Sequence, residues 1–129
     1  MIGIVIVAHG GLAAEYLNAI EHVVGKQNGI VAVKVNADYD RPAKQAEIMQ
    51  AAEDVDSGEG VVVVTDMFGS SPSNLSVAAC EKKNRRVLYG ANLPMLVKLA
   101  KCRSKPMQEA VNHAVKAGRK YIDCMPFDA

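Results

Sequence analysis

The chain has 129 residues, of which 50% are hydrophobic and only 5% aromatic, so its length suits one domain with an aliphatic core. Lys and Arg total 15 and Asp and Glu total 14, which gives a net charge of +1. This balance gives no reason to expect a nucleic acid or an anionic membrane as partner, because binding to either requires clustered positive charge.

The N-terminal run from Ile2 to Ala8 is apolar and rich in β-branched residues, which is typical of a buried parallel strand. It ends at His9, which a Gly10-Gly11 turn follows. Similar runs then alternate with segments whose apolar residues recur at helical spacing. Strands are expected over residues 2–8, 30–35, 60–65 and 87–89, and helices over residues 12–24, 40–55, 72–82, 94–101 and 106–117. A last short strand is expected over residues 121–125.

The connections between these elements are short, which predicts an α/β fold with a doubly wound, mainly parallel sheet. Ser71-Pro72 is expected to cap and open the third helix, and Gly118 to stop the last one. The basic run from Lys82 to Arg86 is expected to be a solvated turn, with a contact to an acidic partner as the alternative.

Membrane insertion and metal binding are not indicated. The first apolar run is far shorter than the roughly 20 residues of a membrane span, and it lacks the basic leader of a signal peptide. Cys80, Cys102 and Cys124 are widely spaced and form no Cys-x-x-Cys motif, so no zinc site or disulfide framework is predicted. We therefore expect a cytoplasmic protein with buried, reduced cysteines and without a metal or cofactor.

Two residues that could take part in proton or phosphoryl transfer lie where predicted strands end. His9 follows the first strand, and Asp66 follows the third. Each alone is a weak signal, because a polar residue at a strand end often only caps the next helix. If the two strands are neighbours, however, both side chains lie at the carboxyl edge of the sheet, where ligands collect in open α/β folds. A carboxylate that accepts from one nitrogen of His9 would fix its tautomer and leave the other nitrogen with a lone pair.

The loop after Asp66 has the composition of an anion-binding turn. Gly69-Ser70-Ser71-Pro72 offers a flexible turn, two hydroxyls and the start of a helix; the alternative is a helix cap and nothing more. The chain has no Gly-x-Ser-x-Gly elbow for a serine nucleophile and no Walker or Gly-x-Gly-x-x-Gly motif for a nucleotide. The histidine itself is therefore the better nucleophile candidate.

Three motifs together resemble a known family. The His-Gly pair after the first strand, VTDMFGSSPSN from Val64 to Asn74 and GANLPML from Gly90 to Leu96 occur in order at fitting distances. This combination resembles the enzyme IIA component of the mannose (mannose–fructose–sorbose) family of the bacterial phosphoenolpyruvate-dependent sugar phosphotransferase system, and the resemblance covers nearly the whole chain. Gly11 and Ser73 depart from it, because family members often carry larger residues there.

The resemblance implies a phosphotransferase that acts as a histidine phosphocarrier. His9 would accept a phosphoryl group from phospho-HPr and pass it to a IIB component for sugar uptake and phosphorylation, and Asp66 would orient His9. The residues implied at the phosphate are Gly10, Gly69, Ser70 and Ser71. The implied sheet order is 2-1-3-4, with an antiparallel strand after Gly118 that is exchanged between the subunits of a homodimer.

Residues 1–129 are expected to form a single IIA-type domain, without a linker or a IIB domain. Two alternatives remain at this point. The chain could be a regulatory sensor of the same fold, whose phosphorylation changes the charge at the strand edge and switches a protein partner without driving sugar transport. The other alternative is a flavodoxin-like protein that binds a small molecule.

Overall fold

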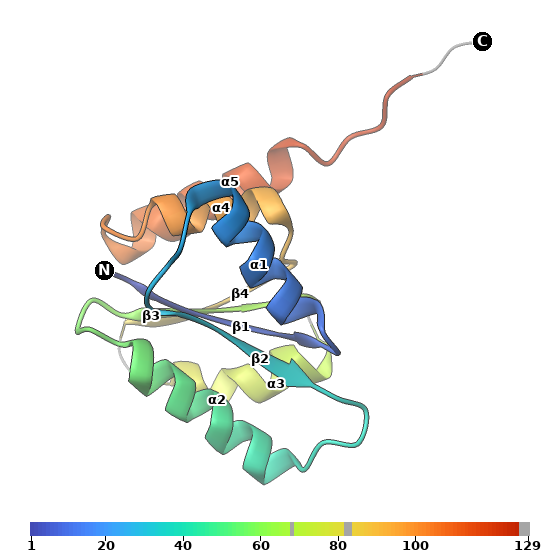
Figure 1. The fold of residues 1–129 in the computed structure, drawn as a ribbon, viewed down its shortest axis with the longest axis vertical. Helices are drawn as coiled ribbons and strands as arrows, with labels where there is room; N and C mark the ends of the chain where they lie inside the picture. Colours follow the sequence, from blue (N-terminus) through green and yellow to red (C-terminus); the bar gives the residue numbers. More distant parts are fainter. Residues whose placement is uncertain (68, 82–83, 127–129) are drawn as a thin grey trace.

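A four-stranded parallel sheet in the order β2-β1-β3-β4 forms the centre of the chain in the computed structural model (Figure 1). The structure describes residues 1–67, 69–81 and 84–126. The strands are β1 (Gly3–His9), β2 (Ile30–Val35), β3 (Val61–Thr65) and β4 (Arg85–Tyr89). The predicted fold class and strand order are confirmed.

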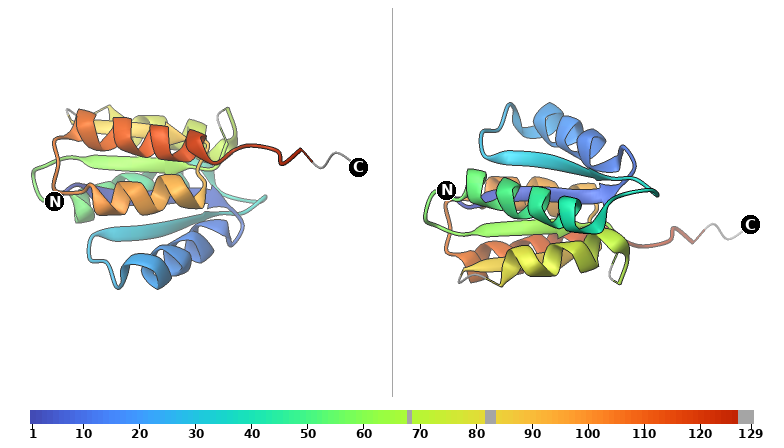
Figure 2. Two further views of the ribbon diagram at one scale, coloured as in Figure 1. Left: turned by 90° about the horizontal axis from the view of Figure 1, so that it is seen from above. Right: turned by 90° about the horizontal axis from the view of Figure 1, so that it is seen from below.

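Within the residues that the structure describes, five α-helices connect and cover these strands: α1 (Leu12–Val24), α2 (Arg41–Val55), α3 (Ser71–Val77), α4 (Leu93–Lys101) and α5 (Met107–Lys120), with a 3₁₀ turn, Ala78–Cys80, after α3. Helices α1, α4 and α5 cover one face of the sheet, and α2 and α3 cover the other (Figure 2). None of the helices within the described ranges has the length and apolar composition that crossing a bilayer requires.

The continuous apolar strands are explained by this three-layer arrangement. All four valines of β3, Val61 to Val64, are fully buried. Successive side chains of a strand point to opposite faces, so a strand covered on both faces must be apolar at every position. Accordingly, Val62 and Val64 belong to the core under α1, α4 and α5, whereas Val61 and Val63 belong to the core above α2 and its neighbours.

The register of the strands places His9 and Asp66 at the same edge of the sheet. Val7 of β1 lies opposite Thr65, the last residue of β3, and His9 lies opposite Val35, the last residue of β2. Because all four strands are parallel, their carboxyl ends share this edge of the sheet. His9 and Asp66 therefore come from adjacent strands.

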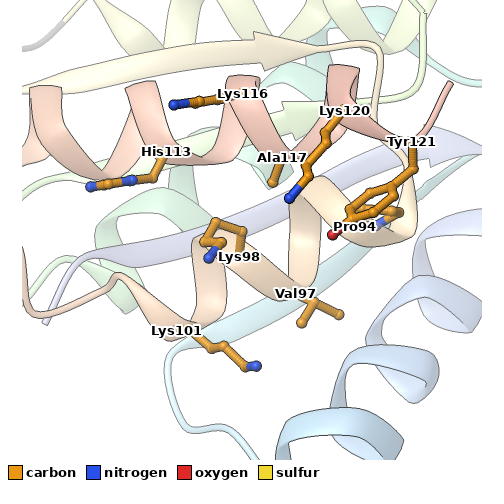
Figure 3. A pocket seen from close by; sticks show the side chains of 9 residues that line it. All are labelled: Pro94, Val97, Lys98, Lys101, His113, Lys116, Ala117, Lys120 and Tyr121. Carbon is orange, nitrogen blue, oxygen red and sulfur yellow. The ribbon is translucent and has the colours of Figure 1, made fainter.

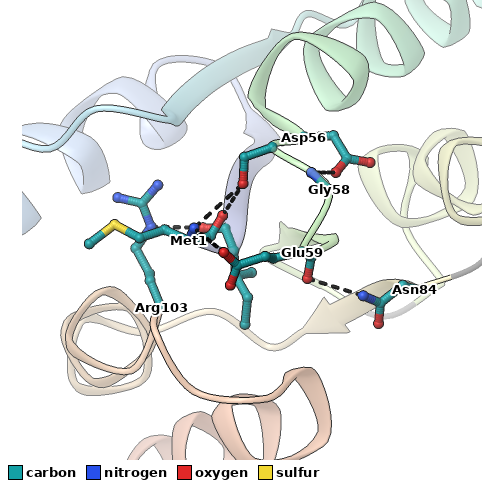
Figure 4. A network of polar contacts seen from close by, with 8 residues as sticks. Met1, Asp56, Gly58, Glu59, Asn84 and Arg103 are labelled. Carbon is teal, nitrogen blue, oxygen red and sulfur yellow. Dashed lines mark hydrogen bonds and ion pairs between the residues drawn. The ribbon is translucent and has the colours of Figure 1, made fainter.

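At the opposite edge of the sheet, polar contacts join the N-terminal residues to segments that are distant in the sequence (Figure 4). The amino group of Met1 lies 3.0 Å from a carboxylate oxygen of Glu59. The Nε of Arg103 donates to the carbonyl of Ile2 over 2.8 Å. Gly60 has a φ of +96°, and a side chain there would collide with the backbone carbonyl of Asn84. The loop before β3 therefore requires glycine at this position.

The basic run before β4 differs from its prediction. Arg85 is the first residue of β4 and is 5% exposed. Its guanidinium lies 3.3 Å from Glu53 and 3.2 Å from Asp56. An arginine buried in this way needs carboxylate partners, so Arg85 is part of the fold rather than of a solvated turn. Lys82 and Lys83 lie outside the described residues.

The boundaries of two helices, α3 and α5, also differ from their predictions. The residue before α3 is Ser70, so Ser71 is the first residue of the helix rather than its cap, and α3 itself ends at Val77. Helix α5 continues through Gly118 to Lys120. A side chain at position 118 would approach the Cβ of Met95 to 3.1 Å. Gly118 is therefore explained by close packing of α5 on α4, not by a helix stop.

The expected last strand is absent from the described part of the C-terminal segment. Residues 121–126 form no strand and run away from the body of the molecule (Figure 1). Helix α5 ends at Lys120, three residues later than predicted, so it includes the first residues after Gly118, where the strand was expected to begin. An isolated strand also lacks a neighbour for its backbone N–H and C=O groups. The segment continues to Phe127, which lies outside the described residues.

The three cysteines differ in exposure. Cys102 is buried and Cys80 is half-buried, as expected, but Cys124 in the C-terminal segment is exposed, so the prediction of buried cysteines was wrong for it. Burial raises the pKa of the Cys80 thiol to about 11, so this cysteine is unreactive at neutral pH.

Candidate functional site

His9 stands at the carboxyl end of the central strand β1 with its imidazole open to solvent. Its side chain is 52% exposed, whereas the six residues before it in the strand are all buried. Gly10 follows with a φ of +54° and donates its N–H to the carbonyl of Val35 over 3.0 Å. Glycine tolerates this left-handed conformation, which turns the chain from β1 toward the start of α1.

Asp66 holds His9 at two points. One oxygen, Oδ2, accepts the backbone N–H of His9 over 3.0 Å and lies 2.7 Å from the ring Nδ1. The other oxygen, Oδ1, accepts the backbone N–H of Met67 over 2.9 Å. The side chain of Asp66 is only 10% exposed. Its carboxylate is therefore fixed in position, and it fixes the ring of His9 in turn.

The carboxyl group of Asp66 stays ionised at neutral pH. Burial alone would raise its pKa, but the hydrogen bonds from His9 and Met67 and the charge of the His9 ring outweigh burial and lower the pKa below its ordinary value. An ionised carboxylate can only accept hydrogen bonds. The Nδ1 of a neutral His9 ring therefore carries the proton, and its Nε2 carries the lone pair.

A pocket of about 340 Å³ adjoins His9. It is lined by His9, Gly10, Val35, Asn36, Ala37, Tyr39 and Ser71. Four of these residues belong to the end of β2 and the loop toward α2, a segment to which the sequence reading gave no role. The signal for it was available, because β2 is also a parallel strand and its end reaches the same edge as the ends of β1 and β3.

The predicted phosphate-binding residues are not all at this pocket. Gly10 and Ser71 line it, but Gly69 and Ser70 do not. The hydroxyl of Ser70 donates to the carbonyl of Met67 over 2.6 Å, and Gly69 has a φ of +78°. These two residues shape the loop after Asp66.

In the described ranges, no group of three or more His, Cys, Asp or Glu side chains could hold a metal ion.

Comparison with known proteins identifies the family. The sequence model of the family EIIA-man, described as the PTS system fructose IIA component, matches residues 3–116. The chain is 31% identical to the mannose-specific PTS EIIAB component of Escherichia coli K12, over 96% of this chain and 39% of that protein. It is also 31% identical to the putative phosphotransferase enzyme IIA component YadI of the same strain, over 80% of this chain and 71% of YadI. The chain thus spans less than half the length of the EIIAB relatives.

Solved structures agree with this relationship. The phosphotransferase system component EIIA from Streptococcus agalactiae superimposes with a TM-score of 0.85 at 26% identity, over 96% of this chain and 97% of that one. The mannose/sorbose-specific IIA subunit from Enterococcus faecalis gives a TM-score of 0.86 over 99% and 97%, but its 21% identity speaks for the fold alone. The motifs around His9, Asp66 and Leu93 thus led to the right family, and the chain belongs to the mannose-family enzyme IIA components of the sugar phosphotransferase system.

Proposed function

We propose that the chain is a phosphocarrier that accepts a phosphoryl group on Nε2 of His9 from phospho-HPr and passes it to a IIB component. The observation that carries this proposal is the 2.7 Å contact between Nδ1 of His9 and the ionised carboxylate of Asp66. It leaves Nε2 as the nucleophilic nitrogen of an exposed ring. Membership of the family supports HPr and a IIB component as donor and acceptor, and the contact of Nδ1 with Asp66 supports Nε2 as the atom that is phosphorylated.

In the proposed step, the lone pair of Nε2 attacks the phosphorus of the donor's phosphohistidine. The P–N bond of the donor breaks as the new P–N bond forms, and the donor ring leaves as a neutral imidazole if its other nitrogen carries a proton. His9 keeps its Nδ1 proton and becomes a phosphorylated ring with a positive charge. Asp66 balances that charge from 2.7 Å, in the role that a buried carboxylate has beside a catalytic imidazole.

Phosphoryl transfer of this kind depends on positioning and on stabilisation of charge more than on covalent machinery. The Gly10 turn and Ser71 line the space beside His9, and α1 begins at Leu12, directly after the turn. The unpaired backbone N–H groups of the first turn of a helix favour a negative charge nearby. We propose that Gly10, Ser71 and the start of α1 receive the phosphoryl oxygens, and that Gly69 and Ser70 only set the shape of the loop.

We also propose that the working form is a homodimer in which residues 121–126 of one subunit add a strand to β4 of the other. β4 ends the strand order of the sheet. A groove between β4 and α5 is lined by Val87, Tyr89, Val115 and Ile122, among others. The exposed fractions of Tyr121, Ile122 and Met125 are 65%, 74% and 67%. Pairing of this segment with β4 of a partner would cover part of this apolar surface.

The test is phosphorylation of the purified chain by phosphoenolpyruvate, enzyme I and HPr, followed by transfer to a candidate IIB. We expect one acid-labile phosphate per chain, absent from His9→Ala, and its loss when IIB is added. His22→Ala is the matched control, because His22 is exposed on α1 and lies outside the site, and it should be phosphorylated normally. An acid-labile phosphate that persists in His9→Ala would refute the assignment. Phosphorylation without transfer to any IIB would favour the regulatory alternative.

A further inference from the structure

The net charge of +1 conceals an uneven distribution of charge along the chain. Residues 93–121, which contain α4 and α5, hold seven of the 15 Lys and Arg residues but only one of the 14 Asp and Glu residues. The other residues carry eight basic and 13 acidic side chains. Five of the seven basic residues lie on α4 and α5 themselves, so these helices are basic in a chain that is otherwise acidic: Lys98, Lys101, Lys116, Arg119 and Lys120.

Part of this charge lines a groove between α4 and α5, here called the lysine groove (Figure 3). Its volume is about 410 Å³, within the roughly 300–1,000 Å³ of typical small-molecule sites. The lining residues are Pro94, Val97, Lys98, Lys101, His113, Lys116, Ala117, Lys120 and Tyr121. They include no acidic side chain. The lysine groove is separate from the His9 pocket, with which it shares no residue.

The four lysines of the groove are exposed, and none has a carboxylate partner among the described residues. Lys98 and Lys101 are three residues apart on α4, and Lys116 and Lys120 are four apart on α5. Like charges at these spacings on a helix destabilise it. No carboxylate of the described residues pairs with these lysines, so the groove suits an anionic ligand that supplies negative charge.

The arrangement indicates which kind of anion fits. On α5 the two lysines of the groove, Lys116 and Lys120, are four residues apart, which is about 6 Å at the helical rise of 1.5 Å per residue. An ammonium group acts as a point charge that pairs well with phosphate. Several such groups within this short distance fit an anion whose charges are closely spaced. Adjacent phosphoryl groups have this property.

Part of the lining of the groove is apolar or aromatic. Pro94, Val97 and Ala117 contribute to the lining, and the ring of Tyr121 lies beside Pro94 (Figure 3). The ammonium of Lys120 lies 5.3 Å from the centre of that ring, a cation–π distance. Such a surface offers contact to an organic group attached to the phosphates.

We propose that the lysine groove binds a small organic polyphosphate, with its phosphoryl groups among Lys98, Lys101, Lys116 and Lys120 and its organic part against Val97 and Tyr121. This site is distinct from His9 and takes no part in phosphotransfer. It would let a phosphorylated metabolite or nucleotide bind to a protein that itself carries phosphoryl groups. The site does not depend on the proposed function.

The test is calorimetric titration of the full chain with ATP and, separately, with inorganic triphosphate. We expect saturable one-site binding of ATP, displaced by triphosphate and weakened by added salt. The variant Lys98→Gln/Lys116→Gln removes one charge from each helix and should weaken binding about tenfold. Lys26→Gln/Lys34→Gln is the matched control, because it makes the same change in net charge at exposed lysines outside the groove, and it should bind as the parent chain does.

Thermal unfolding of each variant checks that it is folded, and Lys101→Gln/Lys120→Gln is a second groove variant with the same expected loss. The proposal fails if ATP does not saturate, or if the control weakens binding as much as the groove variants do. It also fails if the parent chain does not bind ATP but sediments with phosphatidylglycerol vesicles. Failure to sediment with phosphatidylcholine vesicles would then make the groove a contact site for anionic membranes. Phosphorylation of His9 should proceed normally in the groove variants; slower transfer from HPr would make the groove a docking surface for that protein instead.

Discussion

The carboxyl group of Asp66 accepts two backbone N–H groups and faces the ring of His9, so it joins the ends of β1 and β3 as well as setting the tautomer. These two roles can be separated by substitution. An amide at this position keeps the shape and one acceptor oxygen but has no charge to balance a phosphorylated ring. The single residue thus links the stability of the sheet edge to the chemistry proposed for it.

We predict that Asp66→Asn and Asp66→Ala slow phosphorylation of His9 about 10- to 100-fold with the fold retained. The reason is the loss of the anion that stabilises the cationic ring. Initial rates of transfer from phospho-HPr, with circular dichroism as a check on folding, measure the effect. Asp54→Asn is the control, because Asp54 lies on α2, where its carboxylate accepts from Gln50; its rate should equal that of the parent chain. Equal rates for all variants would remove Asp66 from the mechanism.

The lowered pKa of Asp66 also predicts a dependence of stability on pH. Because the folded-state pKa lies below the ordinary value of 3.8, ionised Asp66 stabilises the fold at neutral pH, and this contribution disappears as the pH falls through the folded-state pKa. The difference in unfolding free energy between the parent chain and Asp66→Asn should therefore shrink on acidification from about pH 7 to about pH 3. Urea denaturation at both pH values measures it, and a difference independent of pH would contradict the assignment.

At the scale of secondary-structure elements, the contact between α4 and α5 decides several features. Asn92, which precedes α4, donates its side-chain amide to the carbonyl of Gly118 over 2.8 Å and accepts the N–H of Met95 over 3.0 Å. Gly118 packs against Met95 without a side chain of its own. One asparagine thus starts α4 and ties it to the end of α5, which holds the two walls of the lysine groove together.

We predict that Gly118→Leu destabilises the chain by about 1–3 kcal/mol, because a side chain would be forced against the Cβ of Met95 in a packed interface. The midpoint of urea denaturation reports the loss. Asn112→Leu on the exposed side of the same helix is the control, and a surface change of this kind should alter the unfolding free energy by no more than about 0.5 kcal/mol. Similar effects of the two substitutions would show that the helices are packed differently.

At the scale of the whole molecule, the proposed strand exchange and the lysine groove meet where α5 ends. Residues 121–126 lead away from the body of the molecule, and the end of α5 contributes Lys120 and Tyr121 to the groove. His9 is the last residue of β1, and its pocket shares no residue with the groove between α4 and α5. Docking of a phosphoryl donor and occupation of the groove can therefore be tested as separate events.

We predict that Ile122→Asp converts the proposed dimer to a monomer, because a charge on the apolar segment opposes its pairing with β4. Sedimentation equilibrium of the full chain measures the mass. Ser104→Asp is a control with the same change in charge at an exposed position between α4 and α5, and it should stay dimeric. A parent chain that is monomeric at all concentrations would rule out the exchange.

Much of the fold could be read from the sequence, because buried parallel strands and amphipathic helices have distinct periodicities. The order of the strands followed from the family resemblance, and the meeting of His9 with Asp66 followed from two strand ends that share an edge. The loop after β2 could have been assigned to the site, because β2 is a parallel strand that ends at the same edge. A polar loop does not reveal which of its side chains line a pocket, so Asn36 and Tyr39 could not have been singled out.

By itself, the sequence determined the α/β class, the positions of the strands and the family, since these depend on local patterns and short motifs. Only the tertiary structure decided that Arg85 is buried, that Gly118 continues a helix and that four lysines from two helices line one groove. These features depend on contacts between residues that are distant in the sequence and meet only when the elements pack. The residue pattern of a single segment does not identify those tertiary contacts.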